Sequence, residues 1–208
     1  IVDKVTDPSG SAQTFEFDPS WGDNFFLADA TTPADSGELL PGSYSVAEVN
    51  LPAGWSLSNV TCSDGSAPAA IDLGPGETVT CTFTNYLGRG NILVDKVTDP
   101  SGSAQTFEFD PSWGDNFFLA DGDAAHNSGA LLPGTYAVAE LNLPAGWSLT
   151  GATCSDQSDP TAIDLGPGET VTCTFANYLA RGHIIVDKVT DPAGSAQSFE
   201  FDPSWGAN

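Results

Sequence analysis

Positively charged side chains are scarce in this chain of 208 residues. It has 5 Lys and Arg against 28 Asp and Glu, a formal net charge of −23, with 2 His and no Met. Recognition of nucleic-acid phosphates requires a basic surface, so the composition excludes a general nucleic-acid binder, and it argues against docking on anionic lipid. No apolar run is long enough to cross a bilayer, and no signal peptide is visible, which predicts a mature or internal segment without membrane insertion.

Good helix formers such as Lys, Arg, Met and Gln are also rare, whereas the chain has 22 Gly and 15 Pro. Frequent Val, Thr and Phe favour an all-β protein. The alternation of apolar and polar residues predicts these strands in the first 92 residues: Ile1–Thr6, Thr14–Phe17, Asn24–Leu27, Tyr44–Val49, Trp55–Cys62, Thr78–Tyr86 and, more weakly, Ala70–Leu73. About seven strands separated by Gly- and Pro-rich turns predict a β-sandwich of two packed sheets.

Internal repetition is the main organisational feature. Residues 1–92 differ from residues 93–184 at only 20 positions, and the sequence Val-Asp-Lys-Val-Thr-Asp-Pro occurs three times at an offset of 92. The predicted blocks are 1–91 (repeat 1), 92–183 (repeat 2) and 184–208 (partial repeat 3, truncated or completed by a neighbouring chain). A permuted frame that begins near Phe25 fits the count equally well. Because near-identical copies share one function, a functional site needs its residues in both.

Each repeat contains one lysine, inside its first expected strand: Lys4, Lys96 and Lys188. Side chains alternate between the two faces of a strand, which places Lys96 on the apolar face with Ile92 and Val94. The same alternation places one glutamate and one asparagine on the apolar faces of two other strands in each repeat. These are Glu48 and Asn85 in repeat 1, and Glu140 and Asn177 in repeat 2. Unpaired, such groups would be costly to bury.

Two interpretations of this lysine–glutamate–asparagine trio remain open from the residues alone. The first is a buried Lys–Glu ion pair with a hydrogen-bonded Asn. The second is an intramolecular isopeptide bond, because burial favours the neutral lysine amine, which is a nucleophile, and the Asn carboxamide carbon is an electrophile. A protonated glutamate would polarise the amide carbonyl and pass protons to the leaving ammonia. Preorganisation makes such an exchange feasible once, without turnover.

The repeat resembles the B-type repeats of bacterial collagen adhesins and pilins, which implies tandem Ig-like or prealbumin-like (transthyretin-like) sandwiches of about 92 residues. The residues that carry the resemblance are Val2-Asp3-Lys4, Pro41-Gly42-Ser43-Tyr44-Ser45-Val46-Ala47-Glu48, Leu51-Pro52-Ala53-Gly54-Trp55 and Cys81-Thr82-Phe83-Thr84-Asn85. In that family the first-strand lysine joins an Asn or Asp on the last strand with help from the glutamate. The resemblance implies the bonds Lys4–Asn85 and Lys96–Asn177, catalysed by Glu48 and Glu140, and a partner for Lys188 outside this chain.

The four cysteines form two pairs, Cys62 with Cys81 and Cys154 with Cys173. Zinc would require Cys-x-x-Cys or His ligands, and a catalytic thiol would require a histidine base that repeat 1 lacks. We therefore expect one disulfide within each repeat, which favours an oxidising, extracellular setting. A disulfide that closes a loop of this size would stabilise a repeat by about 3 kcal/mol in the chain-entropy model.

The most divergent stretch between the repeats is a polar loop with weak calcium-binding signals. Its candidate oxygen ligands are Asp29, Asp35, Asp121, Asp123 and Asn127. Asp121-Gly122-Asp123 resembles a calcium loop, but Leu132 stands where the bidentate Glu is expected, so a solvated loop is favoured. A second hypothesis is calcium between repeats, held by carboxylates near Asp18, Asp23 and Asp110. No other metal and no cofactor is expected.

Several remaining features carry weaker hypotheses. Asn59-Val60-Thr61 is a glycosylation sequon, although repeat 2 has Gly151 at the matching position. Trp21, Trp113 and Trp205 would suit a carbohydrate platform, but a packing role is favoured. The only histidines, His126 and His183, lie in repeat 2, which argues against a histidine-based hydrolase. Arg89 and Arg181 lie at the junctions, and we expect each to pair with an acidic group of the next repeat.

Together these features predict tandem modules of an extracellular structural protein: a cell-surface stalk, an adhesin shaft or a secreted filament. Its partners would be neighbouring repeats or identical chains, and the short junctions predict stacked units. The alternative is a calcium- or carbohydrate-binding adhesin module. A conventional enzyme would need candidate catalytic residues in both repeats, and none beyond the cross-linking trio is found.

Overall fold

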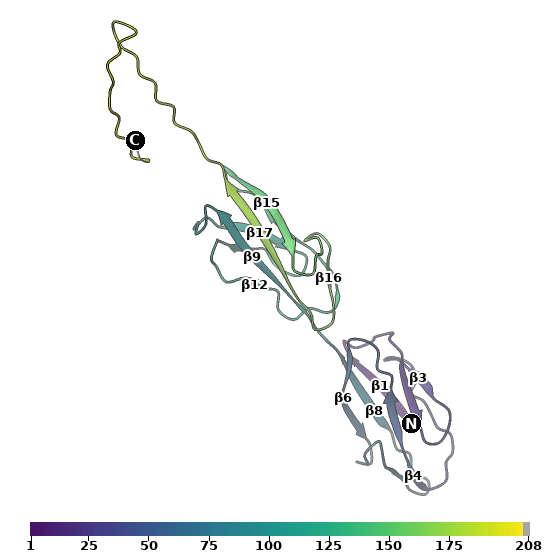
Figure 1. Ribbon diagram of the computed structural model, residues 1–208. Helices are drawn as coiled ribbons and strands as arrows, with labels where there is room; N and C mark the ends of the chain where they lie inside the picture. The colour runs from purple at the N-terminus through teal and green to yellow at the C-terminus, as the bar shows by residue number, and fades with distance from the viewer. Residues whose placement is uncertain (206–208) are drawn as a thin grey trace.

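The computed structural model describes residues 1–205, and within that range it consists of strands, turns and loops without a helix. Two strand-rich units lie end to end along one axis, and an extended segment leads away from the second unit (Figure 1). The units correspond to repeats 1 and 2. The prediction of two all-β repeats of similar size is confirmed.

Repeat 1 is built from eight strands. They are β1 (Val2–Asp7), β2 (Phe15–Pro19), β3 (Phe25–Leu27), β4 (Gly42–Tyr44), β5 (Val46–Val49), β6 (Trp55–Cys62), β7 (Ile71–Leu73) and β8 (Cys81–Leu87). One sheet has the order β1-β8-β6, a second has the order β3-β2-β5, and β4 pairs with β7.

Repeat 2 follows the same plan with nine strands. They are β9 (Asn91–Asp99), β10 (Phe107–Pro111), β11 (Phe117–Leu119), β12 (His126–Asn127), β13 (Gly134–Tyr136), β14 (Val138–Leu141), β15 (Trp147–Cys154), β16 (Ile163–Leu165) and β17 (Thr170–Leu179). Its sheets have the orders β12-β9-β17-β15, β11-β10-β14 and β13-β16. The extra strand β12 covers the free edge of β9, where repeat 1 has only an isolated bridge from Val2 to Ala34.

Each repeat buries a core between its two larger sheets. Phe15 and Phe17 of β2 are buried because alternate residues of a strand point to the same face. The Phe17 ring meets Phe83 of β8 edge to face, with centroids 5.1 Å apart. Phe109 and Phe175 make the same contact in repeat 2. These aromatic pairs fix the spacing between the sheets, and the polar trio lies beside them.

The first and last strands of each repeat are parallel neighbours. In repeat 1, β1 pairs with β8 so that Lys4 lies opposite Phe83 and Thr6 lies opposite Asn85. Parallel neighbours begin at the same pole of a unit and end at the other. The chain therefore enters a repeat at one pole and leaves from the opposite pole, which produces the end-to-end arrangement.

One strand expected from the sequence is two strands in the structure. Tyr44–Val49 divides at Ser45, so that β4 pairs with β7 while β5 pairs with β2 of another sheet. The Ser45 amide donates to Ser20 Oγ, and the Val46 amide donates to the Pro68 carbonyl, which satisfies the backbone at the switch. Alternation still places Val46 and Glu48 on one inward face, as predicted.

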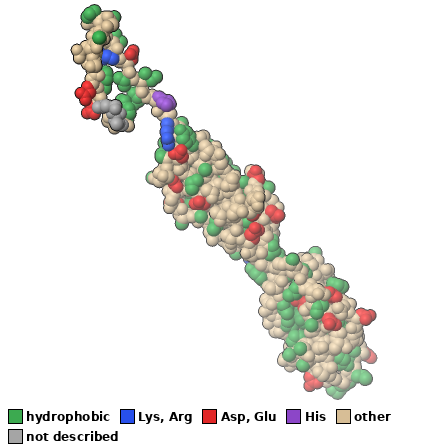
Figure 2. Space-filling model, in the orientation of Figure 1, with side chains coloured by type: hydrophobic (Ala, Val, Ile, Leu, Met, Phe, Trp, Pro, Cys, Tyr) green, Lys and Arg blue, Asp and Glu red, His purple; other side chains and the backbone are tan. Residues whose placement is uncertain are grey.

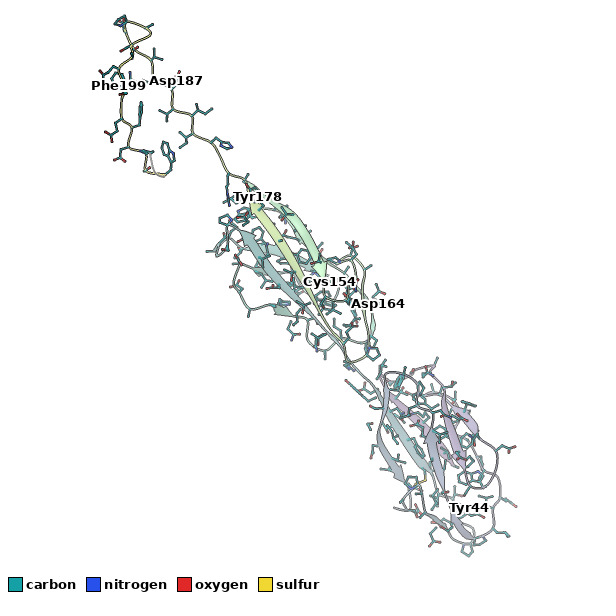
Figure 3. The ribbon with its side chains drawn as sticks, in the orientation of Figure 1. Tyr44, Cys154, Asp164, Tyr178, Asp187 and Phe199 are labelled. Carbon is teal, nitrogen blue, oxygen red and sulfur yellow. A yellow bond between two sulfur atoms is a disulfide. The ribbon has the colours of Figure 1, made fainter. Side chains whose placement is uncertain are left out.

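The segment after β17 contains the described part of partial repeat 3. Residues 184–205 form no strand, and the side chains of Ile184, Ile185 and Val186 are largely exposed. Asp187 and Phe199 lie on its two neighbouring arms (Figure 3), and the Lys188 ammonium lies 4.3 Å from the Phe199 ring centroid. Residues 206–208 of the expected partial repeat lie outside the described residues.

Acidic side chains are scattered over the visible face of both repeats, in keeping with the net charge of −23 (Figure 2). Within residues 1–205, no helix has the length and apolar character that a membrane span requires.

Candidate cross-linking site

The trio of repeat 1 comes together between the two larger sheets. Lys4 projects from β1 and Asn85 from the neighbouring β8, whereas Glu48 projects from β5 of the opposite sheet. The side chains of Lys4 and Glu48 are 1% and 0% exposed, and Asn85 is 0% exposed. The structure thus brings together the three groups that strand alternation predicted to point inward.

Lys4 Nζ has three oxygen acceptors. They are the Asn85 side-chain oxygen at 2.8 Å, the Val5 carbonyl at 2.9 Å and the Phe83 carbonyl at 3.2 Å. The amine also lies 4.2 Å from the ring centroid of Phe15, which belongs to β2 of the opposite sheet. These contacts hold Nζ against the Asn85 carboxamide.

Asn85 bridges the lysine and the glutamate. Its oxygen accepts from Lys4, and its Nδ2 donates to Glu48 Oε2 at 2.8 Å. The direct distance from Lys4 Nζ to Glu48 Oε1 is 3.7 Å, which is too long for a hydrogen bond. Glu48 Oε1 is buried and has no hydrogen-bond partner among the described residues.

Repeat 2 reproduces this arrangement almost atom for atom. Lys96 Nζ donates to the Asn177 side-chain oxygen at 2.9 Å, and Asn177 Nδ2 donates to Glu140 Oε2 at 2.8 Å. Lys96 and Glu140 approach to 3.8 Å, and Glu140 Oε1 again has no hydrogen-bond partner within the described part of the chain. The trio passes the test that a functional site should be present in both copies.

Burial shifts both ionisable groups toward their neutral forms. Desolvation lowers the pKa of the Lys4 ammonium, against the opposing attraction of Glu48. Desolvation likewise raises the pKa of the Glu48 carboxyl, against the opposing hydrogen bond from Asn85 and the charge of Lys4. Lys96 and Glu140 show the same two directions. A neutral amine beside a protonated carboxyl is therefore favoured relative to the same groups in water.

The geometry suits acyl transfer at the asparagine. The lysine amine, whose pKa is lowered by burial, lies 2.8 Å from the oxygen of the carboxamide that it would attack. Glu48 lies on the amide nitrogen, which is the atom that must receive a proton before it can leave as ammonia. The carbonyl oxygen faces Lys4, so the structure supports the proton-transfer role predicted for Glu48 more directly than the carbonyl-polarising role.

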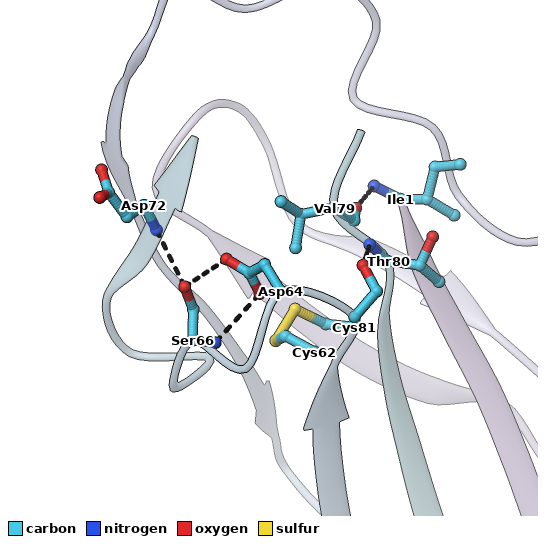
Figure 4. Close-up of a disulfide and its surroundings, with 9 residues drawn as sticks. Ile1, Cys62, Asp64, Ser66, Asp72, Val79, Thr80 and Cys81 are labelled. Atoms are coloured by element: carbon cyan, nitrogen blue, oxygen red, sulfur yellow. Dashed lines mark hydrogen bonds between the residues drawn. A yellow bond between two sulfur atoms is a disulfide. The ribbon is translucent and has the colours of Figure 1, made fainter. Parts of the chain in front are cut away.

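Both expected disulfides are present. Cys62 is bonded to Cys81, and Cys154 to Cys173, each joining directly opposed residues of neighbouring antiparallel strands. Figure 4 shows the first disulfide beside the start of β1, where the Ile1 amino group donates to the Val79 carbonyl. The disulfide fixes the register of β6 on β8, four residues before Asn85.

Sequence reasoning missed a carboxylate close to the trio. Asp29, placed by sequence in a solvated or calcium-binding loop, accepts hydrogen bonds from Thr6 and Gly10. Asp121 does the same with Thr98 and Gly102 in repeat 2. Residues 2–29 are identical to residues 94–121, so the repeat comparison offered no signal that set this aspartate apart.

The structure does not gather the remaining carboxylates into a metal site. Within residues 1–205, no group of three or more His, Cys, Asp or Glu side chains is placed to hold a metal ion. Asp123 accepts from the Ala120 amide, and Asp121 from Thr98 and Gly102. Calcium binding stays a prediction, which calcium titration tests.

The tryptophans of the two repeats contribute to packing. Trp21 and Trp113 lie against the cores of their repeats and meet Tyr44 and Tyr136 edge to face. Trp205 is exposed. Carbohydrate binding stays a prediction, which a glycan array tests.

The expectation for the arginines is wrong. Arg89 pairs with Asp7 at 3.2 Å, and Arg181 pairs with Asp99 at 2.9 Å, so each bonds within its own repeat. The reason is the parallel pairing of the first and last strands: Asp7 ends β1 at the pole where β8 also ends. Asn59 is exposed on β6, and its glycosylation stays a prediction.

A family model for a prealbumin-like fold domain matches residues 1–87 and again residues 92–179. The chain belongs to this prealbumin-like family. The two matches cover the strands from β1 to β8 and from β9 to β17, so each repeat is one family domain. No curated protein has a detectably similar sequence.

Solved structures with this fold include the Bacillus anthracis TIE protein, at 20% identity and a TM-score of 0.58 over 86% of this chain. This chain spans about a third of that protein, 33% of its length. The Streptococcus pyogenes major pilin matches at 15% identity over 86% of this chain and 96% of the pilin, with a TM-score of 0.45. A C-terminal fragment of the pilus adhesin SpaC from Lactobacillus rhamnosus GG matches at 17% identity over 88% of this chain and 98% of the fragment, with a TM-score of 0.46.

Proposed function

We propose that this chain is part of an extracellular structural repeat protein, a stalk, adhesin shaft or filament, whose domains are closed by Lys–Asn isopeptide bonds. The proposal rests on one observation: both repeats bury a lysine amine against an asparagine carboxamide, with a glutamate on the amide nitrogen. Lys4 would join Asn85, and Lys96 would join Asn177.

The proposed reaction exchanges one amide for another. Lys4 Nζ attacks Asn85 Cγ, a C–N bond forms, and the bond from Cγ to Nδ2 breaks. One amine proton passes through the Glu48 carboxyl to Nδ2, which leaves as ammonia. Glu48 ends in the protonation state in which it began. The carboxyl acts once in each domain, so the protein is not a turnover enzyme.

The positions of the two ends of the cross-link suit a load-bearing role. Tension applied along the chain enters a repeat at β1 and leaves at β8, and these parallel strands are the ones that the bond would join. A covalent Lys4–Asn85 link would carry that tension past the 80 residues between them, since the two are 81 positions apart. The folded domain would then not be extended by force.

The surroundings of the site support an extracellular location. Each repeat has a disulfide on the strand that carries the reactive asparagine, and disulfides persist in oxidising compartments. The acidic surface of Figure 2 favours solubility through mutual repulsion. Adhesion to a ligand would add to this structural role rather than replace it.

Intact mass of the reduced protein tests the proposal. Each bond expels one ammonia, so the described repeats should together lower the mass by about 34 Da, through the amine attack given above. Glu48→Ala should restore about 17 Da, and tryptic mapping should place the remaining bond in repeat 2. No bond is expected at Lys188 within one chain. A mass equal to the sum of the residues would leave the buried ion pair as the explanation.

A further inference from the structure

A second carboxylate, that of Asp29, contacts Thr6 beside the reacting groups. Asp29 Oδ2 lies 2.8 Å from the Thr6 hydroxyl, accepts from the Gly10 amide at 2.6 Å and accepts from the Thr6 amide at 3.3 Å. Thr6 is 3% exposed and lies directly opposite Asn85 on the neighbouring strand. One carboxylate oxygen thus holds the end of β1 at the level of the reactive asparagine.

The same contacts occur in repeat 2. Asp121 Oδ2 lies 2.8 Å from the Thr98 hydroxyl and accepts from the Gly102 amide at 2.5 Å. The Thr6 and Thr98 hydroxyls also lie 2.8 Å from the Pro8 and Pro100 carbonyls. In the extended segment, which is not packed in a repeat, the Thr190 hydroxyl makes the corresponding bond to the Pro192 carbonyl at 3.0 Å. The local turn therefore forms without the carboxylate, and the aspartate serves something beyond the turn.

The aspartate connects the two sheets that the reaction needs to align. Asp29 follows β3, in the sheet β3-β2-β5 that supplies Glu48, whereas Thr6 belongs to the sheet β1-β8-β6 that supplies Lys4 and Asn85. The Asp29–Thr6 contact is therefore a polar tie between the sheets beside the trio. Its loss would let β1 shift relative to β5, and a shift of about 1 Å is enough to slow a preorganised reaction severely.

We propose that Asp29 and Asp121 are positioning residues for cross-link formation, each holding the lysine strand in register with the glutamate sheet. This inference rests on the proposed isopeptide function. Neither aspartate contacts the reacting atoms, and each acts through the threonine that it binds.

Charge cannot be the contribution of Asp29, because its sign is unfavourable. The charged groups that face Lys4 are Glu48 from β5, Asp29 from the loop after β3 and Asp3 from β1 itself, and all three favour the ammonium form. Attack requires the neutral amine. The contribution that remains for Asp29 is its contact with Thr6, which ties the two sheets together.

The test follows bond formation in the full chain. Protein kept unfolded in denaturant from lysis onward is refolded by dilution with disulfide formation, and the loss of ammonia from each repeat is followed by peptide mass mapping. Asp29→Ala removes the accepting oxygen and should slow bond formation in repeat 1 by roughly ten- to a hundredfold at every pH, as expected for a misplaced pair. Asp29→Asn keeps an oxygen that can accept the same hydrogen bonds and removes only the charge, so it should slow the reaction far less. Repeat 2 of the same molecule is the internal reference, and Asp121→Ala should reverse the pattern.

Matched variants separate position from general loss of structure. Thr6→Val removes the hydroxyl and should slow repeat 1, whereas Thr6→Ser keeps it and should restore the rate. Asp3→Asn removes a nearby charge from a side chain that accepts from the Lys4 backbone amide and does not tie the two sheets, so it should not slow bond formation. Rates are compared for the folded fraction, measured by near-ultraviolet circular dichroism.

Each result has one reading. An Asp29→Ala rate equal to or above that of the wild type, or a rate curve that merely moves to lower pH, overturns the positioning role while the cross-link stands. Equal rates for Thr6→Val and Thr6→Ser also overturn it. If neither repeat of the wild type loses ammonia, the proposed function itself is overturned.

Discussion

Pro167 of repeat 2 packs directly on Gly54 of repeat 1. A β-carbon added at Gly54 would lie 2.5 Å from Pro167 Cγ, so the close contact requires glycine. The Gly88 amide donates to the Gly54 carbonyl at 2.9 Å, and the Asn91 amide donates to the Glu169 carbonyl at 2.8 Å. The short linker is thus bound to both repeats, and the junction is a packed surface rather than a free tether.

Gly54→Val should loosen this junction. The side chain would collide with Pro167, so we expect a broader distribution of angles between the repeats, measured by small-angle scattering and by fluorescence transfer between labels on the two units. Gly146→Val is the matched control, because Gly146 has φ +85° against +82° for Gly54 and meets Leu179 in place of Leu87. In both variants a side chain at positive φ strains the backbone, which should lower the free energy of unfolding by about 1 kcal/mol. Only Gly54→Val should change the angles between the repeats. Equal scattering profiles would contradict the packed junction.

Strand alternation predicted the inward direction of Lys4, Glu48 and Asn85, because a period of two fixes which face a side chain takes. The pairing of Cys62 with Cys81 followed from their number and the lack of metal ligands. Alternation does not say to which sheet a strand belongs, so the switch at Ser45 was invisible. That switch matters, because it places β5 and Glu48 on the sheet opposite Lys4.

Side-chain contacts between residues far apart in the sequence were also not predicted. The tie from Asp29 to Thr6 joins residues 23 positions apart through a side chain, and no periodic pattern records it. The partner of Arg89 was missed because the parallel pairing of β1 and β8, which brings Asp7 to the same pole, is a property of the fold. The parallel pairing of β1 and β8 has to be seen before the Arg89–Asp7 contact can be inferred.

Single-molecule stretching should distinguish the two covalent links in repeat 1. In the wild type, a Lys4–Asn85 bond should prevent extension of that repeat. In Glu48→Ala, the repeat should unfold and extend, except for the loop closed by Cys62 and Cys81, which are 19 residues apart. Reduction should then add roughly 65 Å of contour length, at about 3.4 Å per residue. Unfolding of the wild-type repeat to full length would contradict the load path.

The disulfide should matter most where the isopeptide bond is absent. In a Glu48→Ala background, replacing Cys62 and Cys81 by serine should lower the free energy of unfolding of repeat 1 by about 3 kcal/mol, the chain-entropy value for a loop of this size. Denaturant titration measures this free energy of unfolding. The fluorescence of Trp55 reports on repeat 1 when the other tryptophans have been replaced. With Glu48 intact, the same serine pair should cost less, because the unfolded chain is already closed by the Lys4–Asn85 bond. Equal losses in both backgrounds would show that no such bond is present.

His126 should make the edge of repeat 2 sensitive to acid. Its ring stacks on Phe117 with centroids 3.6 Å apart, and burial lowers the pKa of the imidazole. A lowered folded-state pKa means that the unfolded state binds the proton more readily, so this stability is complete above the ordinary histidine value of about 6.5 and declines as the pH falls below it. The Ser128 amide, which donates to the Ile92 carbonyl, should lose protection against hydrogen exchange on acidification. The Ala34 amide of repeat 1, which donates to the Val2 carbonyl and stands at the position of His126, should keep its protection. His126→Ala should abolish the pH dependence at Ser128. Protection that is constant from pH 8 to 5 at Ser128 would refute the role of the imidazole.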